Sequence, residues 1–138
     1  MDQSSRVVVD TDILIDYFAG ISPATEAVER LFREDRLALT TLTLFELSCG
    51  AQTQEQRQDL EWIIQAAQLI PLDAVASIQA GAIYRQLKSK GQLLEPTDLL
   101  IAASCVAVGL PLLTRNVRHF RRVTELALLE ARSLLETG

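Results

Sequence analysis

Short apolar runs alternate with longer segments of helical spacing along most of the chain. Runs rich in β-branched residues and bounded by polar ones predict buried strands, whereas apolar positions three or four residues apart predict helices. The predicted strands occupy residues 6–10, 37–41, 69–72 and 110–114. The predicted helices occupy residues 13–19, 23–34, 43–50, 55–67, 74–88 and 96–108. Residues 126–130 fit either a fifth strand or the start of a terminal helix.

Polar and glycine residues at the ends of these segments support several boundaries. Thr11 and Asp12 can cap the first helix, and Asp73 can cap the helix at residues 74–88. Gly109 is placed to end the last helix.

Strands that alternate with helices of this length predict an α/β fold, with a parallel four- to five-stranded sheet and helices on both faces. A length of 138 residues without repeats or linkers predicts a single domain over residues 1–138. Hydrophobic residues make up 49%, which fits a sheet that is buried on both faces. Ligands of such sheets bind beyond the carboxyl ends of the strands, so polar residues there are candidates for function.

Four polar residues lie at this edge of the predicted sheet. Asp10 ends the first strand, Glu46 lies early in the helix after the second strand, and Asp98 lies in the first turn of the last helix. Asn116 follows the fourth strand by two residues. Each acid alone is explained as well by the preference of carboxylates for helix N-termini. Their joint placement, from segments far apart in the sequence, predicts a shared acidic pocket.

Such a pocket suits a divalent cation, because carboxylates within a few ångströms repel one another without one. Oxygen ligands select hard cations, so we expect Asp10, Glu46 and Asp98 to hold Mg²⁺ or Mn²⁺. His119 is the only histidine, which excludes a histidine-rich zinc or iron site. A hard cation can orient and deprotonate a water and hold a phosphate, so the pocket predicts hydrolysis of phosphodiesters.

Net charge is −5, so contact with nucleic acid requires a local basic patch. Arginines gather at residues 115–122, directly after the fourth strand, and Arg115 is our candidate for phosphate contact. Arg118 is a second candidate, although a solvated turn explains it as well. We expect His119 to be structural rather than a general base. Arg85 and its neighbouring lysines form a weaker basic edge.

The two cysteines, Cys49 and Cys105, lie in apolar stretches without a CxxC motif, and we expect buried reduced thiols rather than a zinc or redox site. The chain shows neither a signal peptide nor the roughly 20 apolar residues of a membrane span. We therefore expect a soluble, cytoplasmic protein.

Four segments together resemble the PIN-domain ribonucleases, specifically the VapC-type toxins of toxin–antitoxin pairs. They are VVVDTDILID at residues 7–16, TLTLFELSCG at 41–50, PTDLLIAAS at 96–104 and GLPLLTRNVRHF at 109–120. Each segment is moderately specific, but four in this order and spacing, over almost the whole chain, are strongly specific.

The resemblance implies a magnesium- or manganese-dependent endoribonuclease that forms a homodimer and is held inactive by a cognate antitoxin. Asp10, Glu46 and Asp98 would be its acidic metal-site residues. Thr11 would orient Asp10 or bind a water, and Thr114 would support the pocket from the strand end.

The resemblance also implies surfaces for RNA and protein partners. Arg115 and Arg118 would contact RNA. An antitoxin segment would cover the groove and place a basic side chain in the acidic pocket. Candidate dimer surfaces are the helices at residues 23–34 and 55–67.

Asn116 departs from the family pattern, which often has a fourth acid at this position. An amide offers one neutral acceptor oxygen, so it is a weaker ligand for hard cations, and we expect Asn116 to orient a water or ligand. A second metal would then be held weakly until RNA phosphate arrives. Asp12 either compensates for the missing acid or is an exposed acid of the first helical turn.

Two alternatives belong to other functional classes. Asp10-Thr11-Asp12 resembles the nucleophile and acid pair of haloacid-dehalogenase-type phosphatases. However, Leu14 stands where that family has Thr or Val, and Asp98 lacks the second acid of its late motif. The other alternative is a catalytically weak PIN fold kept as a binding module. The missing fourth acid favours this module, and three intact acids argue against it.

Overall fold

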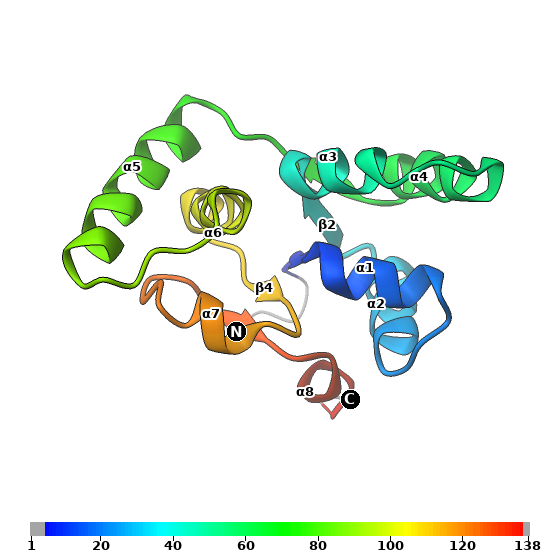
Figure 1. The fold of residues 1–138 in the computed structure, drawn as a ribbon. Helices are drawn as coiled ribbons and strands as arrows, with labels where there is room; N and C mark the ends of the chain where they lie inside the picture. The colour runs from blue at the N-terminus through cyan, green and yellow to red at the C-terminus, as the bar shows by residue number, and fades with distance from the viewer. Residues whose placement is uncertain (1–4, 137–138) are drawn as a thin grey trace.

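One parallel sheet organises the computed structural model, which describes residues 5–136 (Figure 1). The strand order is β3-β2-β1-β4-β5, and every neighbouring pair is parallel. The strands are β1 (Val7–Val9), β2 (Leu37–Thr40), β3 (Gln68–Ile70), β4 (Leu112–Leu113) and β5 (Leu128–Leu129). The predicted α/β fold is confirmed, and the open choice at residues 126–130 is resolved as a strand.

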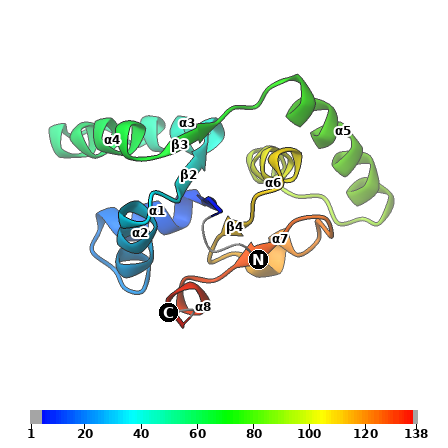
Figure 2. The same cartoon turned by 180° about the vertical axis from the view of Figure 1, so that it is seen from behind.

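Helices cover both faces of the sheet, as Figures 1 and 2 show. One face is covered by α6 (Pro96–Val108) and α7 (Val117–Phe120), and α5 (Ala74–Ser89) packs against α6. The other is covered by α1 (Thr11–Phe18), α2 (Ala24–Arg33), α4 (Gln54–Ala66) and α8 (Ala131–Glu136). The remaining helix, α3 (Thr41–Cys49), follows β2 directly and contacts both α4 and α6.

Two hydrophobic cores lie on opposite faces of the sheet, and the side chains of a strand alternate between them. Val8 packs beneath α5 and α6, whereas Val7 and Val9 pack beneath α1 and α2, and all three are fully buried. Successive side chains of a strand point to opposite faces, so a strand covered on both faces must be apolar throughout. This explains the uninterrupted valine run that leads to Asp10.

Two helices begin two residues earlier than predicted, because a polar side chain directly after or at the end of a strand caps each one. Asp10 Oδ1 accepts the N–H of Thr11 at 2.8 Å, so α1 starts at Thr11. The prediction that Thr11 and Asp12 cap this helix was wrong. Thr40 Oγ1 accepts the N–H of Thr43 at 3.1 Å, so α3 begins as soon as β2 ends.

The end of the chain contains one helix that the sequence pattern did not predict, α7, and a terminal helix, α8, that starts only after the strand. The single turn α7 follows β4, and α8 follows β5. Gly109 ends α6 as predicted, in the left-handed conformation with φ of 69° that favours glycine. Asp73 also caps α5 as predicted, since its Oδ1 accepts the N–H of Ala76 at 2.9 Å.

No helix within residues 5–136 is both long and apolar enough to cross a lipid bilayer. Cys105 is buried, and its burial raises the pKa of the thiol to about 12. Cys49 is exposed at the end of α3, so the expectation of a buried thiol was wrong there. The expectation of no signal peptide rests partly on residues 1–4, which lie outside the described residues.

Candidate active site

The acidic pocket begins where β1 and β4 lie side by side. Val9 pairs with Leu113 in parallel register, so Asp10 and Thr114 leave the sheet together. From β1 the chain extends the sheet to one side through β2 and β3, while β4 and β5 extend it to the other. This is the point of an open α/β sheet at which ligand crevices form.

Asp10 is the most deeply placed acid of the pocket, with 5% of its surface exposed. Its Oδ2 accepts a hydrogen bond from the Thr114 hydroxyl at 2.8 Å. Burial, and then the charges of Asp12 and Asp98, raise the pKa of Asp10 to about 7, although its bonds from Thr114 and Thr11 oppose the rise. Thr114 therefore contacts Asp10 directly, which is consistent with a supporting role.

Glu46 reaches the same region from α3. The Thr11 hydroxyl donates to Glu46 Oε1 at 2.6 Å and lies 3.0 Å from the hydroxyl of Thr43. Thr11 therefore holds Asp10 through its backbone N–H and Glu46 through its side chain. One residue thus links two of the three predicted acids.

Asp98 is half-buried in the first turn of α6. Burial, and then the charge of Glu46, raise its pKa, and the nearby positive charge of His119 lowers it. Asp12 also raises the pKa of Asp98. These mutual influences indicate that acids from α1, α3 and α6 act on one another electrostatically.

Asp12 points into the molecule instead of lying exposed on α1, so that alternative for Asp12 was wrong. Its Oδ2 accepts the backbone N–H of Arg115 at 3.2 Å and lies 3.4 Å from the Thr114 hydroxyl, which can donate to it. Its Oδ1 is buried without a hydrogen-bond partner in the described part of the chain. Burial raises the pKa of Asp12.

Asn116 lies in the turn that follows β4. Its backbone N–H donates to the Thr114 hydroxyl at 2.9 Å, which ties the turn to the hydroxyl that also holds Asp10. Its side-chain amide Nδ2 lies 3.0 Å from Nδ1 of His119. Asn116 therefore contacts the same Thr114 hydroxyl that contacts Asp10.

Arg115 and Arg118 are both exposed, but their surroundings differ. Arg115 Nε lies 3.1 Å from Asp16 Oδ2, and the Asp16 side chain is only 13% exposed. Asp16 is therefore a partly buried ion-pair partner of Arg115. No ion pair holds Arg118 within residues 5–136, so its guanidinium is available to a ligand.

The donor set fits a hard divalent cation that shares its coordination with water and substrate. In the described residues, no three His, Cys, Asp or Glu side chains are arranged to hold a metal ion by themselves. Mg²⁺ typically binds through one or two carboxylates and keeps several waters or takes up phosphate oxygens. The partnerless buried oxygen of Asp12 and the raised pKa values of Asp10 and Asp98 indicate a site in which negative charge exceeds nearby positive charge.

Sequence reasoning missed two contributors to this site. Thr43 joins the hydroxyl cluster beneath Glu46, and its position three residues before Glu46 on a helix was the available signal. Asp16 holds Arg115, and its position four residues after Asp12 placed it on the same face of α1.

Comparison with known proteins identifies the family. The family model described as PIN domain matches residues 7–126. The chain belongs to the PIN-domain family. Ribonuclease VapC1 of Methanocaldococcus jannaschii is 33% identical over 126 residues, which cover 91% of this chain and 87% of that protein. The tRNA(fMet)-specific endonuclease VapC of Shigella flexneri is 26% identical over 122 residues, which cover 86% and 92%. This PIN domain is therefore of the VapC type.

Solved structures agree with this assignment of the PIN domain. A chain of VapBC2 from Rickettsia felis, crystallised with a DNA fragment from the promoter, superposes with a TM-score of 0.81 at 22% identity, covering 90% of this chain and 97% of that one. A chain of a toxin–antitoxin complex from Klebsiella pneumoniae gives a TM-score of 0.72 at 25% identity, covering 92% and 98%. Membership in this family decides against the haloacid-dehalogenase alternative.

Proposed function

We propose that this PIN domain is a metal-dependent endoribonuclease that hydrolyses RNA phosphodiester bonds and acts as the toxin of a toxin–antitoxin pair. One observation carries the proposal: Asp10, Glu46 and Asp98 come from three separate segments and meet at the switch point of the sheet, with electrostatic coupling between them. The ribonuclease names of its VapC relatives support the choice of RNA.

Asp10, Glu46 and Asp98 would hold Mg²⁺ or Mn²⁺. When bound, such an ion activates a water and neutralises charge on the phosphate. Thr114 and Thr11 orient the carboxylates of Asp10 and Glu46 through hydrogen bonds of 2.8 and 2.6 Å. Asp10 must release its proton before it can serve as a ligand, so its raised pKa makes metal binding depend on pH.

The RNA backbone would approach from the turn after β4. Arg118 is exposed there without an ion-pair partner among the described residues, and it suits a phosphate oxygen. Arg115 would have to share its guanidinium between Asp16 and RNA. We therefore expect Arg118 to contribute more to RNA affinity than Arg115.

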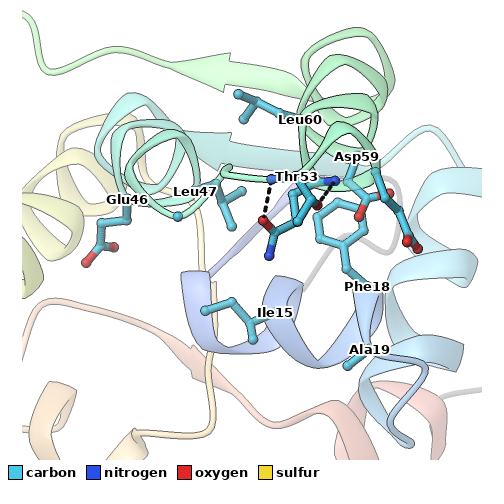
Figure 3. A pocket seen from close by; sticks show the side chains of 11 residues that line it. Ile15, Phe18, Ala19, Glu46, Leu47, Thr53, Asp59 and Leu60 are labelled. Atoms are coloured by element: carbon cyan, nitrogen blue, oxygen red, sulfur yellow. Dashed lines mark hydrogen bonds between the residues drawn. The ribbon is translucent and has the colours of Figure 1, made fainter.

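An antitoxin would occupy the groove between α1, α3 and α4, shown in Figure 3. The groove has a volume of about 600 Å³ and an apolar lining that includes Ile15, Phe18 and Leu60. Asp59 lies toward one end and Glu46 at the other, so the groove leads to the acidic pocket. An amphipathic segment with basic side chains would fit this combination of surfaces.

Cleavage of total RNA by the purified protein, freed of any antitoxin, tests the proposal. We expect fragments with Mg²⁺ or Mn²⁺ and none with a chelator. Asp98→Asn should abolish cleavage, whereas Glu95→Gln should preserve it, because Glu95 is an exposed acid before the same helix and makes no capping bond. Cleavage by Asp98→Asn at the wild-type rate would refute the proposal, and metal-dependent cleavage by the wild type would eliminate the binding-module alternative.

A further inference from the structure

His119 contacts the side chain of Asn116 in the turn that follows β4. Both residues belong to the turn of α7, in which the N–H of His119 donates to the carbonyl oxygen of Asn116 at 3.2 Å. The side-chain amide Nδ2 of Asn116 lies 3.0 Å from Nδ1 of the ring. A spacing of three residues on one helical turn places the ring beside the amide.

This contact determines which end of the amide is engaged. An amide nitrogen can only donate, so Nδ1 of His119 is the acceptor in this contact. The Asn116 side chain makes no other hydrogen bond within residues 5–136, so Oδ1 is the end left for a ligand.

The ring also lies near the acids of the pocket. When its ring is protonated, His119 lowers the pKa of Asp98, whereas burial and the charge of Glu46 raise that pKa. His119 is therefore close enough to Asp98 to influence it, while its Nδ1 atom is occupied by Asn116.

We infer that His119 is a positioning residue, which turns the Asn116 amide so that its oxygen is available to a divalent cation or to the waters around it. The inference rests on the proposed function. A carboxylate at position 116 would need no such partner, because its two oxygens are equivalent, whereas an amide must be turned the right way. The amide at position 116 is thus accompanied by a residue that can hold it in one orientation.

The test measures kcat and KM on RNA, and the Kd for Mn²⁺ on RNA-free protein from the EPR signal of free Mn²⁺. We expect His119→Ala to lower kcat/KM about 10-fold and to weaken Mn²⁺ binding. His119→Gln should lose less than about 3-fold, because its side-chain oxygen can accept the same hydrogen bond. Arg121→Ala, an exposed change on the same turn, should leave the Kd for Mn²⁺ unchanged.

Double variants separate positioning from a direct role. In an Asn116→Asp background, His119→Ala should change kcat/KM and the Kd by less than about 2-fold, and in an Asn116→Ala background it should add nothing. Equal losses in the wild-type and Asn116→Asp backgrounds, or no loss in the wild type, would overturn the inference. A wild-type protein without metal-dependent cleavage would instead overturn the proposed function, so the two failures are distinguishable.

Discussion

Asp10 combines deep burial with like-charged neighbours, so its ionisation should affect folding stability. It is 5% exposed, and burial with Asp12 raises its pKa to about 7. The folded state holds this proton more tightly than the unfolded state, so the free energy of unfolding falls as pH rises from about 4 to about 7. Without metal, Asp10→Asn should be more stable than the wild type near pH 8, by on the order of 3 kcal/mol.

Urea unfolding with a chelator, over a range of pH, measures this difference. The fall in stability should be shallower in Asp10→Asn than in the wild type. Added Mg²⁺ should stabilise the wild type near pH 8 and have little effect on the variant, because the ion binds the ionised carboxylate. Identical pH dependence of the two proteins would show that Asp10 does not carry the raised pKa.

We expect loss of the Thr11 side chain to lower catalysis strongly, because Thr11 bonds to both Asp10 and Glu46. Thr11→Val keeps the backbone bond to Asp10 but removes the hydroxyl that holds Glu46 at 2.6 Å. We expect kcat to fall about 10-fold, as for other partners of metal ligands, with little change in melting temperature. Thr11→Ser should restore most of the activity, and full activity in Thr11→Val would mean that Glu46 needs no such support.

At the scale of elements, the groove between α1, α3 and α4 should bind antitoxin without taking part in cleavage. Asp59 lines the groove, whereas Glu61 on the same helix α4 is exposed and does not. Asp59→Lys should weaken affinity for the antitoxin at least about 10-fold by placing like charges together, and Glu61→Lys should not. Titration calorimetry measures both affinities, and RNA cleavage should be unchanged in each variant. Equal affinities would place the antitoxin elsewhere.

The elements that carry strong local signals are the ones that sequence could predict. The apolar run before Asp10, the cap at Asp73 and the stop at Gly109 each act within a few residues of chain, and the structure confirms them. The helices α7 and α8 are only a turn or two long, and tertiary packing decides such short elements more than their own sequence does.

The place of the candidate residues in the fold was predictable, but the contacts among them were not. Strand ends predicted that Asp10 and Asn116 would lie at one edge of the sheet. The bonds from Thr114 to Asp10 and from Arg115 to Asp12 join residues about a hundred positions apart, and no local pattern encodes them. The same holds for the ion pair that ties Arg115 to Asp16.

At the scale of the whole molecule, the described surface offers a place for a second copy of the chain. On α5, Ile78 is 75% and Val75 is 63% exposed, one turn apart. On the helices suggested by the sequence, Phe32 is 46% and Ile64 is 42% exposed. We propose a homodimer that buries α5, because this removes more apolar surface from water.

Light scattering after size exclusion tests this homodimer. The wild type should have the mass of two chains, and Ile78→Glu should have the mass of one. Phe32→Glu and Ile64→Glu should remain dimeric as matched controls on α2 and α4. If the Ile78→Glu protein is still dimeric, α5 is not the interface, and α2 and α4 become the candidates again.

Heavy-oxygen water gives the most direct test of metal-dependent hydrolysis at the pocket of Asp10, Glu46 and Asp98. RNA is cleaved by the purified protein in water enriched in oxygen-18, and the masses of the new ends are measured. The acidic pocket predicts one heavy oxygen in each new terminal phosphate, only when Mg²⁺ or Mn²⁺ is present, and no cleavage by Asp98→Asn. Cyclic phosphate ends without heavy oxygen, or cleavage that persists in a chelator and in Asp98→Asn, would contradict it.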